Sequence, residues 1–138
     1  MGENATSRAT KENFLNKLSI LGNVTPTNID EVYKIVTNSN SLFLYLKFSK
    51  LHSRMSGWWG LHYETIEWLK HNAPKWKIVL LLDNENLGHV IEPIEFENLE
   101  SKISLSASRQ YELTSNYLPG PPLDFGGMIV KLKQNTTD

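Results

Sequence analysis

Residues 42–50 of this 138-residue chain alternate in polarity in a way that strongly limits the fold. Successive side chains of a β-strand point to opposite faces of the sheet, so alternate residues share a face. The even-numbered face is entirely apolar: Leu42, Leu44, Leu46 and Phe48. The odd-numbered face carries Tyr45 and Lys47, two residues apart. We therefore expect a central strand that packs a core on one face and presents polar groups to a site on the other.

The segments before this strand predict a helix followed by a β-hairpin. Apolar residues recur at helical spacing from about Thr10 to Gly22, and the glycine is typical of a helix end. Residues 32–36 are separated from residues 42–48 by a polar turn, which favours an antiparallel hairpin. A short helix that begins near Asp30 fits the first hairpin segment almost as well.

The segments after residue 60 predict a second helix and a buried strand. Ile66 and Leu69 lie at helical spacing within residues 63–71, and Pro74 ends that pattern. Residues 76–82 form a nearly continuous apolar run, which is typical of a strand buried on both faces. Shorter elements follow: a helix at 94–99, two antiparallel strands at 102–105 and 110–114, and an amphipathic element at 125–132.

This order predicts an α/β fold in which a small mixed β-sheet is flanked by helices. If the strands at 42–48 and 76–82 are parallel neighbours, the helix between them must form a right-handed crossover. We expect one α/β domain at residues 11–133, with flexible ends at 1–10 and 134–138.

Composition excludes several classes of protein. The chain has no Cys, so a disulfide framework, thiolate catalysis and cysteine metal clusters are excluded. A formal net charge of −1 gives no overall positive field for nucleic acid, which leaves only a local basic patch. The start of the chain is polar, and no apolar run approaches the roughly 20 residues of a membrane span. We expect a cytoplasmic protein with no membrane partner.

The order of elements, with Lys47 on the polar face of its strand and Asp30 upstream, resembles the PD-(D/E)XK superfamily. In this restriction-endonuclease-like family, the second hairpin strand carries an acid-X-Lys motif, and a helix and a buried strand follow. The resemblance covers about residues 12–115 and extends to the segments at 60–69 and 88–93. It implies that Lys47 is catalytic and that Asp30 is both a catalytic acid and a metal ligand.

The chain departs from that pattern at Tyr45, which stands in the position of the second acid. Magnesium sites in such enzymes need at least two hard oxygen ligands, which polarise the phosphate and activate water. Glu64 or Glu67, on the following helix, is the candidate for a relocated acid. Lys47 also suits a solvated sheet face, and Asp30 also suits a turn or helix cap. A carboxylate within roughly 4–6 Å of Lys47 would distinguish a site from a solvated surface lysine.

A basic segment with aromatic residues follows the central strand. It contains Lys50, Arg54, Trp58 and Trp59. Arginine and lysine contact phosphates, and an exposed indole stacks on bases or anchors a partner protein. These four residues are the candidate nucleic-acid-binding set. The alternative for the tryptophan pair is that one covers the core edge while the other packs under the next helix.

Three functions stay open. The first is a nuclease-like domain with an incomplete active site that binds DNA, RNA or a protein partner and needs no cofactor. The second is an active magnesium-dependent nuclease that uses Asp30, Lys47 and a relocated Glu64 or Glu67. The third is an assembly subunit without a site, in which the tryptophan pair anchors an interface, including one formed by self-association.

Overall fold

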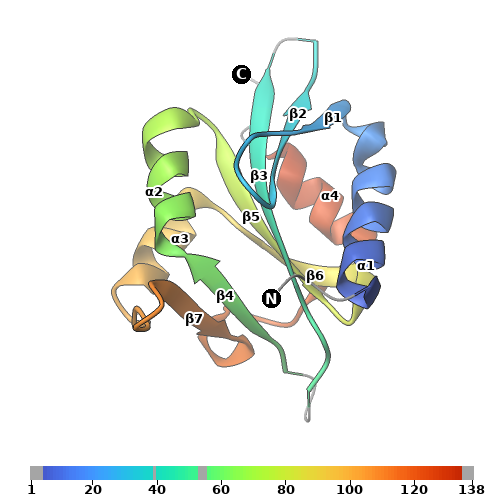
Figure 1. The fold of residues 1–138 in the computed structure, drawn as a ribbon. Helices are drawn as coiled ribbons and strands as arrows, with labels where there is room; N and C mark the ends of the chain where they lie inside the picture. The colour runs from blue at the N-terminus through green and yellow to red at the C-terminus, as the bar shows by residue number, and fades with distance from the viewer. Residues whose placement is uncertain (1–4, 39, 53–55, 135–138) are drawn as a thin grey trace.

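The computed structural model describes residues 5–38, 40–52 and 56–134 and shows two sheets with helices on both sides (Figure 1). The larger sheet has the strand order β1-β2-β3-β5-β6-β8. Its strands are β1 (Asn23–Pro26), β2 (Val32–Val36), β3 (Ser41–Ser49), β5 (Trp76–Leu82), β6 (Asn84–Ile91) and β8 (Leu123–Asp124). β3 pairs antiparallel with β2 and parallel with β5. The predicted α/β fold with a mixed sheet is therefore confirmed.

Helices and a two-stranded ribbon cover the faces of this sheet (Figure 1). The helices are α1 (Ala5–Lys17), α2 (Tyr63–Asn72), α3 (Pro93–Glu100) and α4 (Phe125–Lys133), with short 3-10 turns at Leu18–Ile20 and Ser115–Tyr117. α1 and α4 pack on one face. The other face is covered by α2, α3 and the ribbon of β4 (Trp58–His62) and β7 (Gln110–Thr114). No helix among the described residues has the length and apolar character needed to cross a membrane.

The alternation predicted for the central strand is confirmed in β3. Its even-numbered leucines lie in the core cluster beneath α1 and α4, whereas Tyr45 lies in the opposite cluster with α2 and β4. The odd-numbered face is less open than expected. The ribbon and α2 cover it, so Tyr45 is fully buried, and Lys47 is half-buried.

The expected burial of β5 on both faces is also confirmed, and it includes a lysine. All seven residues of β5 are buried. The Lys77 ammonium donates hydrogen bonds to the carbonyls of Lys131 (2.8 Å) and Leu132 (3.2 Å) and lies 3.2 Å from Glu92 Oε2. The last carbonyls of a helix have no partner within the helix, so Lys77 caps the C-terminus of α4.

Several boundaries differ from the predictions. α1 begins at Ala5, inside the segment expected to be flexible, because buried Ser7 and Thr10 hold its first turns against the protein. Residues 23–26, to which no strand was assigned, form β1 at the sheet edge, and strand β2 stands where a short helix near Asp30 was the alternative. Residues 84–91, to which no strand was assigned, form β6.

The partner of β7 was also predicted incorrectly. Residues 102–105 form no strand and make a single bridge, Leu105 with Tyr111. β7 instead pairs antiparallel with β4, in the register Trp58 with Thr114 through His62 with Gln110. This pairing places residues 114–116 beside the tryptophan segment, which lies more than fifty positions earlier in the chain.

Candidate functional site

The predicted lysine does have a carboxylate beside it, and that carboxylate belongs to Glu31. Lys47 Nζ donates a hydrogen bond of 2.7 Å to Glu31 Oε1. Lys11, which arrives from α1, pairs with the other carboxylate oxygen of Glu31. Asp30, the predicted acid and metal ligand, is exposed and makes no ion pair with the described residues. The carboxylate beside Lys47 is therefore that of Glu31, whereas the sequence suggested Asp30.

The backbone conformation of Glu31 explains why this residue, and not Asp30, contacts Lys47. Glu31 has a φ of 66°, in the left-handed region that non-glycine residues seldom occupy. Its carbonyl accepts a hydrogen bond of 3.0 Å from the Leu46 amide, so this residue extends the contact of β2 with β3. A side chain in this region costs of order 1–3 kcal/mol and persists only where surrounding contacts hold it. Here the lysines on both sides of the carboxylate supply those contacts.

Lys11, Glu31 and Lys47 form what we call the Lys–Glu–Lys cluster, which is largely shielded from water. The side chains are 5%, 17% and 16% exposed, respectively. Burial acts to raise the pKa of Glu31, but the ion pairs with Lys47 and Lys11 outweigh it, and the pKa is lowered. The carboxylate is therefore ionised at neutral pH, and the cluster carries a net charge of +1.

Tyr45 does not supply the missing carboxylate or an equivalent anion. Its hydroxyl accepts a hydrogen bond of 3.0 Å from the His62 amide at the start of α2. Burial raises the pKa of Tyr45 to about 12, so the phenol stays neutral at physiological pH. A neutral, buried hydroxyl with a backbone partner is a poor substitute for a second carboxylate in a magnesium site.

The two acids considered as relocated ligands have other partners. Glu64 is exposed and accepts a hydrogen bond of 2.5 Å from Arg109 Nε. Glu67 lies 3.5 Å from Lys70 on the outer face of α2. Among the described residues, no group of three or more His, Asp or Glu side chains is placed to hold a metal ion. One carboxylate between two ammonium groups does not fit Mg²⁺, which needs several oxygen ligands.

The structure brings part of the predicted nucleic-acid-binding set together. The Ser49 hydroxyl donates to the Lys50 carbonyl (2.7 Å) and accepts from the Trp58 amide (2.9 Å). One side chain at the end of β3 thus holds the two segments together. Lys50 is exposed, and Trp58 is 45% exposed.

The other two members of that set have different positions. Trp59 is buried, and its indole N–H donates to the Leu81 carbonyl at 3.0 Å, so it is a core residue and not a binding residue. One tryptophan of the pair therefore belongs to the core, and the other is exposed. Arg54 lies outside the described residues.

Beside Trp58 the surface has a shallow depression of about 820 Å³, which we call the Trp58 groove. Its lining consists of His52, Ser56, Gly57, Trp58, Thr114, Ser115 and Asn116. Gly57 and Ser115 tie its two sides together, since the Gly57 amide donates to the Ser115 hydroxyl at 2.8 Å. The described residues of the lining carry hydroxyl, amide and imidazole groups and include no carboxylate.

Sequence reasoning missed Glu31, Lys11 and the residues that β7 contributes to the groove. Glu31 is adjacent to the predicted Asp30, and no local pattern distinguishes which acid turns toward Lys47. The contribution of Thr114, Ser115 and Asn116 depends on the pairing of β4 with β7. If residues 58–62 had been recognised as a strand, their pairing with residues 110–114 could have been considered.

The comparisons with known proteins add no identification. No protein-family model matches the chain, and no curated protein matches it. The function is therefore inferred from the geometry of the described residues.

Proposed function

We propose that this chain is a non-catalytic, nuclease-like domain that binds single-stranded nucleic acid at the Trp58 groove. The observation that carries this proposal is the Ser49 hydroxyl, which holds the segments of Lys50 and Trp58 together at the end of β3. Lys50 and Trp58 are both exposed on these neighbouring segments, and cations and aromatic side chains are the two elements of sequence-independent strand binding.

The Lys–Glu–Lys cluster supports the non-catalytic part of the proposal. In a metal-dependent nuclease the lysine would act beside a metal held by two carboxylates. Here Lys47 donates directly to the nearest carboxylate at 2.7 Å, and the position two residues before it is a buried tyrosine. Both features argue against a bound divalent cation and so against metal-dependent hydrolysis.

The Trp58 groove supports the binding part. Stacking of a base on an aromatic side chain contributes about 1–3 kcal/mol, and it requires an unpaired base. Trp58 offers such a surface, and the hydroxyl and amide groups of Thr114, Ser115 and Asn116 offer hydrogen bonds to base edges. A strand is therefore a better ligand than a duplex, in which the bases are already stacked and paired.

The charge of the chain sets the expected salt dependence. The chain has a net charge of −1, and no lysine or arginine is among the described residues that line the groove, so contacts with only one or two phosphates are expected. For single strands the logarithm of the binding constant falls by about 0.7 per phosphate contact for each tenfold rise in salt. The expected slope is therefore shallow, and stacking carries most of the affinity.

Fluorescence polarisation of labelled oligothymidylate and oligouridylate, with the matching duplexes as competitors, tests this proposal. We expect Trp58→Ala to weaken strand binding by roughly 5- to 150-fold, Trp58→Phe to retain most of it, and Lys50→Gln to reduce the salt slope. Lys102→Gln is the matched control, because Lys102 is also exposed and lies in another pocket.

A further variant at the same position distinguishes binding of nucleic acid from binding of a protein partner. Trp58→Leu keeps apolar bulk but removes the aromatic face, so it is expected to weaken binding to the strands almost as much as alanine does. Wild-type protein that binds no strand, or strand binding that Trp58→Ala leaves intact, would overturn the proposal.

A further inference from the structure

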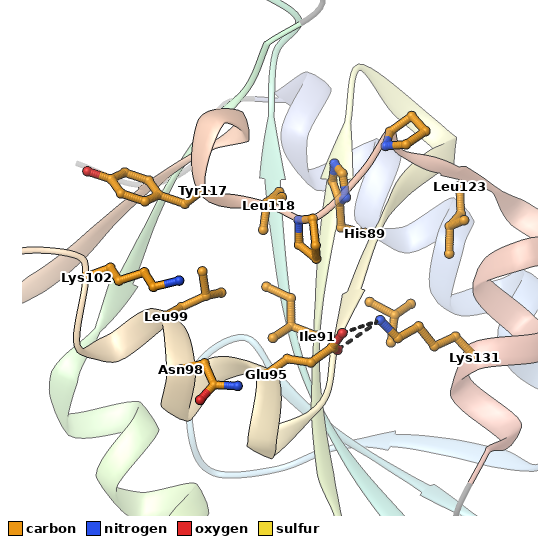
Figure 2. Close-up of a pocket in the computed structure, with 13 residues that line it drawn as sticks. His89, Ile91, Glu95, Asn98, Leu99, Lys102, Tyr117, Leu118, Leu123 and Lys131 are labelled. Carbon is orange, nitrogen blue, oxygen red and sulfur yellow. Dashed lines mark hydrogen bonds and ion pairs between the residues drawn. The ribbon is translucent and has the colours of Figure 1, made fainter.

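A second pocket lies along the edge of β6 that faces away from β5. It has a volume of about 380 Å³ and is bounded by β6, α3, α4 and the segment at residues 117–123. Figure 2 shows His89 at one end of the pocket and the ion pair of Glu95 with Lys131 at the other. Its volume lies in the range of small-molecule sites, about 300–1,000 Å³.

The walls between these polar ends are apolar. Leu99 of α3 and Leu118 of the 117–123 segment lie on one side, Leu123 lies on the other, and Ile91 lies between them (Figure 2). β8 pairs only with Leu87 and Gly88 of β6, so beyond these residues the edge of β6 is left to the pocket. An apolar middle with a few polar groups at its ends is the usual construction of a site for a small organic molecule.

His89 is the first polar group in the pocket that lacks a partner. It is 8% exposed, and its Nε2 has no hydrogen-bond partner. Burial, with a further contribution from Lys131, lowers the pKa of His89 to about 4, so the imidazole is neutral at physiological pH. An unpaired buried polar atom destabilises a fold, and such atoms in native proteins usually meet a ligand or an ordered water.

Lys102 is the second such group. Figure 2 shows its side chain extended toward the pocket past Leu99, and its ammonium has no ion-pair partner among the described residues. The one carboxylate of the lining is already neutralised. Glu95 accepts hydrogen bonds from Lys131 at 2.9 and 3.1 Å, and its Oε1 also accepts one from the Glu92 amide at 2.8 Å.

The groups that remain without a partner thus decide the charge of the ligand. The lining contains two positively charged residues, Lys102 and Lys131, and one negatively charged residue, Glu95, so its net charge is +1. A neutral imidazole adds no charge but supplies a hydrogen bond. A ligand that satisfies all of these groups has an apolar body for the leucine walls and one negative charge for Lys102.

We propose that this pocket binds a small organic acid, in which a planar or branched apolar body carries a single carboxylate. The body packs against Leu99, Leu118 and Leu123, and the carboxylate pairs with Lys102 at the mouth. A polar atom of the body or of the carboxylate bonds to the imidazole of His89. This site is separate from the Trp58 groove, and the two proposals stand or fall independently.

The test compares an acid with its uncharged counterpart of the same shape. Phenylacetate and indole-3-acetate, with phenylacetamide and indole-3-acetamide as matched controls, are titrated into the full chain by calorimetry. We expect the acids to bind roughly 10- to 150-fold more tightly than the amides, because only the acids make a charge-assisted interaction with Lys102. Lys102→Gln is expected to remove this preference, while Lys34→Gln, on β2 and outside the pocket lining, leaves it unchanged.

Nitrogen NMR of the histidine side chains gives a second readout that does not depend on a variant. The chain has four histidines, and His52, His62 and His71 are exposed. Phenylacetate is expected to shift the ring nitrogen resonances of His89 and to leave those of the other three in place. Absence of binding, equal binding of acid and amide, or shifts confined to the exposed histidines would overturn the proposal.

Discussion

Lys47 donates a hydrogen bond of 2.7 Å to Glu31, a residue whose backbone lies in the left-handed region at a φ of 66°. Lys47 lies on β3, Glu31 lies immediately before β2, and Lys11 of α1 contacts the carboxylate from the other side. In the nuclease-like interpretation of this strand, an acid in that place would serve a metal ion. Here the acid, Glu31, pairs with two lysines, and the cluster connects α1, the start of β2 and β3.

The cluster is expected to stabilise the fold through Glu31. Removing one partner of a buried ion pair leaves uncompensated charge and typically costs about 3–5 kcal/mol. Glu31→Ala removes the carboxylate that lies between two lysines, which are 5% and 16% exposed, so we expect a loss of about 3 kcal/mol in the free energy of unfolding, measured by urea denaturation. Asp30→Ala is the matched control and is expected to change stability by less than about 0.5 kcal/mol. Equal effects of the two variants would contradict the assignment of Glu31.

Tyr45→Asp tests the resemblance to nucleases separately from the function. The substitution restores an acid-X-Lys motif on β3 and places a second carboxylate on the face that carries Lys47. Loss of a buried aromatic ring costs about 3–5 kcal/mol, so the variant is expected to melt at a lower temperature. We further expect Mn²⁺ to raise the melting temperature of Tyr45→Asp and to leave the wild type and Tyr45→Asn unchanged. A metal response equal in Tyr45→Asp and Tyr45→Asn would speak against a nuclease-type arrangement.

Stability is expected to fall in mild acid because of His89. Its pKa is lowered to about 4 in the folded chain, and the unfolded value is 6.5. Between these values the unfolded state binds more protons, so the free energy of unfolding decreases as the pH falls from 6.5 toward 4. The decrease is at most about 3 kcal/mol. Urea denaturation at a series of pH values should show a smaller decrease in His89→Gln, and identical curves would refute this origin.

Lys77 is expected to be essential for docking α4. Lys77→Met preserves length and apolar bulk but leaves the carbonyls of Lys131 and Leu132 without their donor and Glu92 without its cation. We expect a loss of about 2–4 kcal/mol in the free energy of unfolding, with early exposure of α4 amides in hydrogen exchange. Lys34→Met, at a half-buried lysine on β2, is the comparison. If both variants unfold alike, the cap contributes little.

The parts of the fold that local periodicity determines could be predicted from the sequence. The alternation in β3 placed its leucines and Tyr45 on opposite faces, and the apolar run at residues 76–82 identified the buried strand β5. Short edge elements could not be predicted in the same way. β1 contains only four residues, three of them exposed, so it has no apolar pattern to read.

The candidate site was predictable only in part, because its geometry depends on contacts between distant segments. The position of Lys47 on the polar face of β3, and the exposure of one residue of the tryptophan pair, could be predicted from the sequence. Whether Asp30 or Glu31 meets Lys47 depends on one left-handed residue, and which tryptophan is exposed depends on how β4 pairs with β7. A two-residue periodicity contains neither piece of information.

The most direct test of the account is a cleavage assay with labelled single-stranded DNA and RNA in the presence of Mg²⁺ or Mn²⁺. The same samples are read for binding by polarisation and for chain length on a denaturing gel. The account predicts strand binding that Trp58→Ala weakens, with every strand recovered at full length. Metal-dependent cleavage that Lys47→Ala abolishes would contradict it and would make the chain a nuclease.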